Sequence, residues 1–253
     1  MAKPLVSIIT PSYNSTKYIG DTIASVQAQT YDHWEMIIVD DCSKDNSREY
    51  IKGFAEADPR IRLIELEVNS GAAVARNTAI NNAKGKYAAF LDSDDLWFPE
   101  KLEKQIAFME EKGYALTYSA YQLMQENGEK LDRFINVPDE VTYKDLLKGN
   151  IIGCLTAIVN IEKTGHIEMP NIRTRQDYAL WLSILKRGFT AYGMNEVLAC
   201  YRLVPGSISS NKVKMAKQNW KVYREVEKLN LFYSAYCFCG YAWNAVKKTY
   251  LKQ

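Results

Sequence analysis

The chain contains 253 residues, of which 47% are apolar and 25% charged, and 32 Lys and Arg against 30 Asp and Glu give a net charge of +2. This composition is that of an ordinary globular protein; it excludes intrinsic disorder and does not favour a nucleic-acid binder of overall basic charge. Five cysteines without a C-x-x-C pair and only two histidines exclude a disulfide framework and a zinc site of the usual spacing. A reducing cytoplasm is therefore the expected environment.

The first residues, MAKPLVSIITPSYN, contain an apolar run of only five residues, which predicts a strand rather than a signal peptide. Similar β-rich runs alternate with helix-like segments along the first half of the chain. Unbroken runs such as VSIIT and EMIIVD are typical of parallel strands that helices cover on both faces. The pattern predicts a doubly wound, mostly parallel α/β sheet that binds ligands at the carboxyl ends of its strands. The expected strands are 5–10, 36–40, 61–66 and 87–92, and the expected helices are 18–29, 47–57 and 72–83.

The second half of the chain has a less regular pattern. Asn127-Gly128 is a strong hairpin signal after an expected strand, and the scattered Gly and Pro of residues 131–174 predict loops and short elements that cover the crevice. The tail, residues 212–253, is expected to be helical from residue 215 onward, and residues 1–211 form the predicted main domain, with halves of about 1–98 and 99–211. The other elements expected here are helices over 99–111 and 177–187, strands over 114–124 and 197–202, and a loop over 203–211.

Polar clusters follow three of the expected strands, at residues 10–14, 40–43 and 92–95. Helix capping and turn formation would explain one or two of these clusters. They do not explain four carboxylates in one crevice, because like charges repel unless a cation or hydrogen-bond donors offset them. An Asp-x-Asp sequence places two carboxylates on one side of the chain, and such ligands suit Mg²⁺ or Mn²⁺ shared with phosphate oxygens. The four residues are Asp41, Asp92, Asp94 and Asp95.

The order of these motifs resembles glycosyltransferase family 2, the inverting enzymes of GT-A fold. Four segments are similar to the family's nucleotide-binding and D-x-D segments: VSIITPSYN, IIVDDCSKDNS, NSGAAVARNTAI and AAFLDSDDLW. Downstream, RQDYALWLSIL resembles the acidic helix start and YRLVPGSIS the late loop, so the resemblance covers about residues 3–211. It implies a nucleotide-binding half, an acceptor-binding half, and transfer of a sugar from a nucleotide donor, expected to be UDP-linked, with Mn²⁺ or Mg²⁺.

The resemblance also implies roles for individual residues. Asp41 would accept a hydrogen bond from uracil, and Asp94 would coordinate the metal that bridges the two phosphates. Asp92 would meet the ribose or a metal-bound water, whereas Asp95 is either a ligand or a cap for the following turn. The residues expected to hold the nucleotide sugar are Pro11, Tyr13, Asp41, Arg76, Asp92, Ser93 and Arg202, and those expected to hold the metal are Asp94 and Asp92.

Asp177 is the candidate general base, because an inverting transfer needs one carboxylate to take the proton of the acceptor hydroxyl. A negative charge at a helix N-terminus is the structural alternative. Gln176 stands where the family commonly has Glu, so the neighbour of the base differs. Arg202, with Ser207 and Ser209, is expected either to close over the diphosphate or to be a surface residue after a strand. Trp181 lies on an amphipathic run, where core packing is favoured over a role in the acceptor site.

The tail carries nine Lys and Arg against two Glu, a net charge of +7, whereas residues 1–211 carry −5. Aromatic and basic residues on helices suit the headgroup region of an anionic membrane. The alternative is that residues 231–246 pack on the main domain or on a second copy of the chain; the stretch is shorter than the roughly 20 residues of a spanning helix. We expect peripheral attachment at the inner face of the plasma membrane and a possible lipid-linked acceptor.

The sequence lacks the Q-x-x-R-W motif of processive family members, which predicts addition of one sugar per acceptor. The expected setting is biosynthesis of a bacterial surface polysaccharide, such as capsule, O-antigen or a teichuronic-type polymer. A nucleotidyltransferase is the nearest alternative enzyme, but TPSYNST lacks the Gly-rich loop it needs. A sugar-binding or scaffold protein of the same fold is the non-catalytic alternative. No nucleic-acid partner is expected, and the oligomeric state, donor sugar and linkage stay open.

Overall fold

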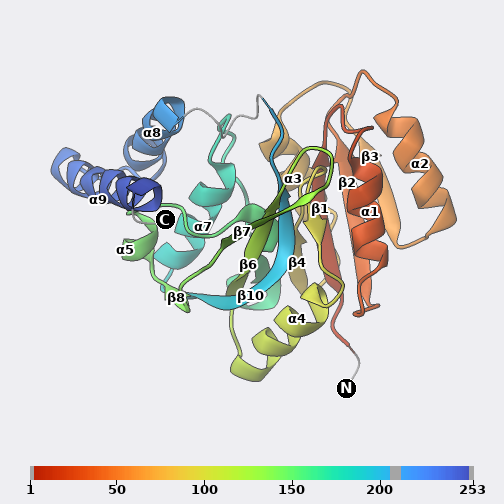
Figure 1. Ribbon diagram of the computed structural model, residues 1–253, viewed down its shortest axis with the longest axis horizontal. Coiled ribbons are helices and arrows are strands. Elements are labelled where there is room, and N and C mark those ends of the chain that lie inside the picture. Colours follow the sequence, from red (N-terminus) through yellow and green to blue (C-terminus); the bar gives the residue numbers. More distant parts are fainter. Residues whose placement is uncertain (1–2, 206–211, 251–253) are drawn as a thin grey trace.

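The computed structural model describes residues 3–205 and 212–250. A single mixed sheet, ordered β3-β2-β1-β4-β9-β6-β10-β5, runs through the centre of the molecule, with β7 paired to β6 and β8 paired to β10 (Figure 1). The predicted α/β architecture, a sheet flanked by helices with a helical C-terminal tail, is confirmed. Figure 1 shows the tail helices at the end of the molecule opposite α2.

The first half follows the predicted alternation of strands and helices. Strand β1 lies between β2 and β4, and β2 also pairs with β3; all three pairings are parallel. This arrangement brings the carboxyl ends of β1, β2 and β4 to the same edge of the sheet. The strands are β1 (Val6–Ser12), β2 (Trp34–Asp40), β3 (Ile61–Glu65) and β4 (Tyr87–Phe90), and the helices are α1 (Ile19–Gln27), α2 (Ser47–Ala57) and α3 (Ala72–Asn81).

The second half contains more regular structure than the sequence indicated. Strand β9 (Ile158–Asn160) lies antiparallel between β4 and β6 and so joins the two halves into one sheet. The expected strand over 197–202 is the end of a longer strand, β10 (Ala191–Arg202), which is irregular between Met194 and Ala199. The other elements are β5 (Leu96–Trp97), α4 (Lys101–Lys112), β6 (Leu116–Met124), β7 (Lys130–Ile135), β8 (Glu140–Val141), α5 (Tyr143–Leu146), α6 (Ile161–Thr164) and α7 (Gln176–Lys186).

Helices cover both faces of the sheet, because successive strand residues point to opposite sides. Ile8 and Ile38 contribute to a core formed with α1, α2 and α4, whereas Ile9 and Ile37 contribute to the core formed with α3 and α7. Trp181 belongs to the second core, where its ring meets Phe90 edge to face at 5.2 Å. The expectation that Trp181 packs in the core is therefore confirmed.

The tail consists of α8 (Lys212–Lys221), a π-helical turn (Val222–Val226) and α9 (Leu231–Tyr250). Tyr223 is fully buried, and its hydroxyl donates to the carbonyl oxygen of Leu147. The carboxylate of Glu227 accepts from the Tyr143 hydroxyl at 2.6 Å and pairs with Lys186 at 3.0 Å. The tail thus packs on the main domain beside α5 and α7. Among the described residues, no helix is long and apolar enough to cross a membrane.

A buried lysine on α4 leads to a prediction about pH and stability. Burial lowers the pKa of Lys101 from 10.5 to about 7, and its Nζ atom donates to the Oε1 atom of Gln105 at 2.6 Å. Between pH 7 and 10.5 the unfolded chain binds more protons at this residue than the folded chain, so the contribution of Lys101 to stability rises with pH. From pH 7.5 to 9.5 we expect this contribution to grow by about 2 kcal/mol, measured by urea unfolding as the difference between the unaltered protein and a variant that lacks the lysine.

The matched variant for this measurement is Lys101→Met, which removes the titrating group and keeps a long apolar stem. Over the same pH interval, the free energy of unfolding of the unaltered protein should rise by about 2 kcal/mol relative to that of the variant. Equal pH dependence of the variant and the unaltered protein would contradict the assignment to Lys101.

Candidate active site

The register of the sheet brings the three polar clusters together. Ser12 of β1 pairs with Asp40 of β2, and Ile9 pairs with Phe90 of β4, so the chain leaves all three strands at one edge. Pro11 is buried near the end of β1, while Tyr13, just beyond it, is 45% exposed. The predicted residues of the first, second and fourth strands therefore share one side of the molecule.

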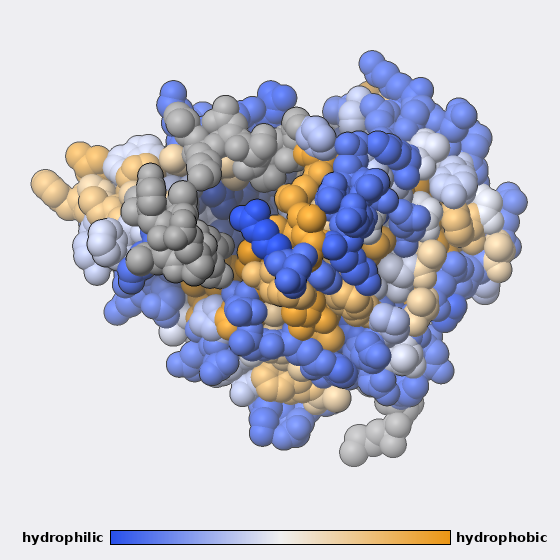
Figure 2. Space-filling view, in the orientation of Figure 1, coloured by the Kyte–Doolittle hydropathy of each residue, from blue (hydrophilic) through white to orange (hydrophobic). Residues whose placement is uncertain are grey.

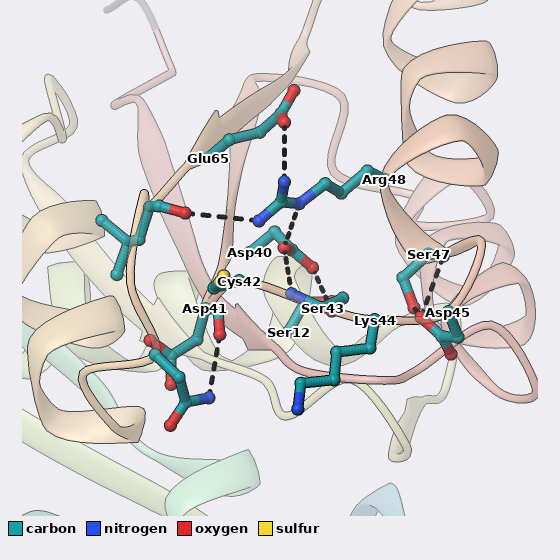
Figure 3. Close-up of polar contacts among 12 residues, drawn as sticks. Ser12, Asp40, Asp41, Cys42, Ser43, Lys44, Asp45, Ser47, Arg48 and Glu65 are labelled. Atoms are coloured by element: carbon teal, nitrogen blue, oxygen red, sulfur yellow. Dashed lines mark hydrogen bonds and ion pairs between the residues drawn. The ribbon is translucent and has the colours of Figure 1, made fainter.

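The turn after β2 is fixed by Asp40, a contribution that the sequence analysis did not identify. Its fully buried carboxylate accepts from the Ser43 amide at 2.8 Å and from the Arg48 Nε atom at 2.7 Å. Arg48 also reaches Glu65 on β3, at 3.6 Å (Figure 3). Because these bonds hold residues 40–43 to α2 and β3, the following residue, Asp41, has a defined position.

Asp41 connects the turn after β2 to the start of α3. Its two carboxylate oxygens accept from the backbone amides of Ser70 at 2.6 Å and Gly71 at 2.8 Å, and its carbonyl oxygen accepts from Asn69 at 2.9 Å. Negative charge is favourable at a helix N-terminus. Each carboxylate oxygen has more than one acceptor direction, so this capping contact is compatible with the expected hydrogen bond to a base.

Arg76 and Asp92 form an ion pair within the site. The Arg76 Nη2 atom lies 2.5 Å from the Oδ1 atom of Asp92, and the arginine is buried on α3. Burial alone would lower the pKa of Arg76, but the facing charge of Asp92 raises it overall. The Nε atom of Arg76 is buried and has no hydrogen-bond partner among the described residues.

The next two acidic residues, Asp94 and Asp95, differ in how deeply they are buried. Burial, together with the charge of Asp92, raises the pKa of Asp94 to about 6. Asp95 is almost completely buried, and burial and its acidic neighbours raise its pKa well above the usual range. The Oδ1 atom of Asp95 accepts from the Arg202 amide at 2.9 Å. Asp95 therefore ties the Asp-x-Asp turn to the end of β10, and Ser93 lies half-buried between the other two carboxylates.

Arg202 is not the surface residue that one of the two alternatives expected, because it is buried at the end of β10. Its buried guanidinium donates to the carbonyl oxygens of Asp94 at 2.7 Å and Glu126 at 2.9 Å, and pairs with Asp21 at 3.2 Å. It also lies 4.9 Å from the centre of the Tyr18 ring. These contacts make Arg202 a support for the turn that carries Asp94. The neighbouring residues expected to act with it, Ser207 and Ser209, lie outside the described residues.

Asp177 lies in the first turn of α7, where it is half-buried. Its Oδ2 atom accepts from the Nδ2 atom of Asn150 at 3.4 Å. The charge of Asp177 helps to raise the pKa of Arg76 and of Cys154, which places it within electrostatic reach of the Arg76–Asp92 pair. Gln176 is buried and donates to the carbonyl oxygen of Arg173 at 3.2 Å, so Asp177 supplies the carboxylate at this helix start.

The donor set fits a divalent cation that is shared with a ligand. The described residues contain no group of three or more His, Cys, Asp or Glu side chains placed to hold a metal ion by themselves. Mg²⁺ and Mn²⁺ are commonly bound through one or two carboxylates, with water and substrate phosphates completing the shell. Asp94, whose ionised form is disfavoured by burial and by Asp92, is a carboxylate that a cation would stabilise.

A separate cavity of about 500 Å³ lies on the other side of α7. Its lining includes Lys186, Arg187 and Glu227, but none of the predicted site residues. We therefore assign the chemistry to the strand-end cluster, where the carboxylates and the buried arginine converge.

Comparison with known proteins agrees with this geometry. Residues 7–163 match the family model described as Glycosyl transferase family 2. TuaG of Bacillus subtilis (strain 168), provisionally named a teichuronic acid biosynthesis glycosyltransferase, is 59% identical over 97% of this chain and 98% of its own length. An Escherichia coli protein, UDP-Glc:alpha-D-GlcNAc-diphosphoundecaprenol beta-1,3-glucosyltransferase WfgD, is 42% identical over 86% of this chain and 85% of its own.

Solved structures share the fold at lower sequence identity. S. aureus TarS 1–349 in complex with UDP-GlcNAc superposes with a TM-score of 0.73 at 21% identity, over 95% of this chain and 72% of that chain. The mannosyltransferase PcManGT from Pyrobaculum calidifontis, in complex with GDP-Man and Mn²⁺, gives a TM-score of 0.70 at 17% identity, over 98% of this chain and 76% of that chain. With the family model matching more than half of the chain, the protein belongs to glycosyl transferase family 2 and has the GT-A fold.

Proposed function

We propose that this glycosyltransferase moves one sugar from a UDP-sugar to a hydroxyl of a lipid-linked acceptor, with inversion, during assembly of a bacterial surface polysaccharide. The observation that carries this proposal is the Arg76–Asp92 ion pair, which lies at the sheet edge that also carries Asp41 and Asp94. The names of TuaG and WfgD support the setting, and the name of WfgD supports both a UDP-linked donor and an undecaprenol-linked acceptor.

The donor is proposed to bind across the ends of β1, β2 and β4. Tyr13, Asp41 and Pro11 would hold the base, and Arg76 and Asp92 would hold the ribose. A divalent cation, Mn²⁺ or Mg²⁺, held by Asp94 and Asp92 would neutralise charge on the departing diphosphate. Arg202 would act indirectly, since it supports the Asp94 turn from behind.

The transfer step needs one base. The acceptor oxygen attacks the anomeric carbon and forms the new glycosidic bond while the bond from that carbon to the diphosphate oxygen breaks. The acceptor proton passes to the carboxylate of Asp177, and the nucleoside diphosphate leaves with the electron pair. A single displacement of this kind inverts the anomeric configuration, and the absence of Q-x-x-R-W from the sequence supports release after one transfer.

The proposal is tested by incubating the protein with a panel of UDP- and GDP-sugars, Mn²⁺ or Mg²⁺, and acceptors that carry a sugar diphosphate on a short lipid. We expect metal-dependent release of UDP from one UDP-sugar, together with addition of a single sugar to the acceptor, and loss of both with a chelator. Turnover of none of the donors, or the appearance of polymer ladders, would contradict the proposal.

A further inference from the structure

One side of α9 is an exposed surface that the transfer reaction does not use. We call it the outer stripe; its aromatic side chains Phe232, Tyr236 and Trp243 are 86%, 60% and 62% exposed. The positions recur at helical spacing and lie on one side of the helix. Figure 2 shows hydrophobic residues at the outer end of the molecule where Figure 1 places α9. The outer stripe comprises Leu231, Phe232, Ala235, Tyr236, Cys239, Ala242 and Trp243.

The opposite side of α9 fixes the orientation of the helix. Cys237 is buried, and Phe238 meets Trp220 of α8 edge to face at 5.6 Å. Near the other end of the helix, the Nδ2 atom of Asn244 donates to the carbonyl oxygen of Lys148 at 3.0 Å. Because α9 is held by α8 and by the segment after α5, the outer stripe faces away from the main domain.

Basic residues flank the outer stripe along the sequence. Residues 229–246 contain no Asp, Glu, Lys or Arg, and Lys228 and Lys247 flank this stretch. One of the two acidic residues of the tail, Glu227, is buried and paired with Lys186 at 3.0 Å, so it offsets little of the exterior charge. The other exposed basic residues of the tail are Lys214, Lys217, Lys221 and Arg224.

We propose that the outer stripe binds an anionic lipid bilayer, with α9 lying in the plane of the interface. Exposed aromatic and apolar residues flanked by lysines are the features that bind interfacial helices to anionic lipids. A second copy of the chain fits less well, because pairing of two outer stripes would bring the positively charged tails together. The helix is also too polar to cross the membrane.

This surface is connected to the candidate active site by a short path. Asn244 of α9 contacts the backbone of Lys148, and two residues further along the chain, Asn150 contacts Asp177. Tyr223 holds the same segment from the π-helical turn. Asp177 is therefore linked to the proposed membrane-binding helix through one short segment of chain. This consequence rests on the proposed function, since it serves a lipid-linked acceptor.

The test is flotation of the full chain with vesicles of phosphatidylglycerol and phosphatidylcholine. We expect the protein to float with these vesicles and to float much less with phosphatidylcholine alone or at high salt, which screens the lysines. The triple variant Phe232→Ser, Tyr236→Ser and Trp243→Ser should lose about tenfold or more in the ratio of bound to free protein. Phe134→Ser on β7, at a residue that is 44% exposed, is the matched control and should float normally.

Three results would overturn the inference: failure of the unaltered chain to float, equal flotation of the triple variant, or conversion of a dimer to a monomer by the triple substitution in sedimentation experiments. UDP binding without vesicles distinguishes the two proposals. If the triple variant stops floating but binds UDP, the surface is separate from the site. If neither the unaltered chain nor the triple variant binds UDP, the proposed function fails while the flotation result stands.

Discussion

Replacing Asp177 by Asn is expected to lower the rate of sugar transfer about a thousandfold while changing donor affinity by no more than about twofold. The amide has nearly the same shape as the carboxylate and can keep its place in the first turn of α7 beside Asn150, but it cannot take up the acceptor proton. The measurement is the transfer rate under donor and acceptor saturation, together with UDP affinity by calorimetry.

Asp132→Asn supplies the control. It removes the same charge from an exposed carboxylate on β7, away from the site. Its transfer rate should equal that of the unaltered protein. An Asp177→Asn variant that retained a rate within about tenfold of normal would show that another group accepts the proton.

Replacing Asp94 by Asn is expected to abolish metal-dependent donor binding and also to stabilise the fold. Burial and the charge of Asp92 raise the pKa of Asp94 to about 6, so at pH 8 the folded protein holds this carboxylate ionised in an unfavourable environment. The amide removes that repulsion. We expect the free energy of unfolding to rise by about 1–2 kcal/mol, after allowance for the partial exposure of the side chain.

The sign of this effect depends on pH. Because the pKa of Asp94 is raised in the folded state, the folded chain binds more protons than the unfolded chain between about pH 4 and pH 6. The contribution of Asp94 to stability therefore falls as the pH rises from 4 to 6. The advantage of the Asp94→Asn variant should therefore be present at pH 8 and largely absent at pH 4. Urea unfolding at both pH values measures it. Retained Mn²⁺-dependent UDP binding, or a loss of stability at pH 8, would contradict the role given to Asp94.

The first half of the fold was predictable because the strands β1, β2 and β4 are buried on both faces. Runs such as those in β1 and β2 contain few polar residues, and the polar residues that follow them mark the edge where they end. The family motifs lie in this region. The prediction of a GT-A fold with a helical tail was confirmed for these reasons, and the end of the loop expected over 203–211 lies outside the described residues.

The region over residues 131–174 was less predictable. Strand β9 has only three residues, and β7 is largely exposed, so neither gives a strong apolar period. The start of β10 was missed because Asn195 and Glu196 interrupt its apolar pattern at the irregular part of the strand. Membership of β9 and β10 in the sheet depends on pairing with β4 and β6, which lie far away in the sequence.

The site, like the fold, was predictable only in part. The positions of Asp41, Asp92 and Asp177 followed from the order of the strands and from the family motifs, but their roles stay predictions. The contacts of Arg202 with Asp94 and Glu126 depend on the packing of three separate segments, and no local pattern predicts them. In the sequence, the anchoring of Asp40 by Arg48 was visible only as an acidic residue at the end of an apolar run, followed by a basic residue eight positions later.

The central claim, a single inverting transfer, is tested most directly by the anomeric configuration of the product, determined by proton NMR. From a donor whose sugar is α-linked to the diphosphate, we predict one added sugar, β-linked to the acceptor. An α-linked product would contradict direct displacement with one base, and more than one added sugar would contradict release after each transfer.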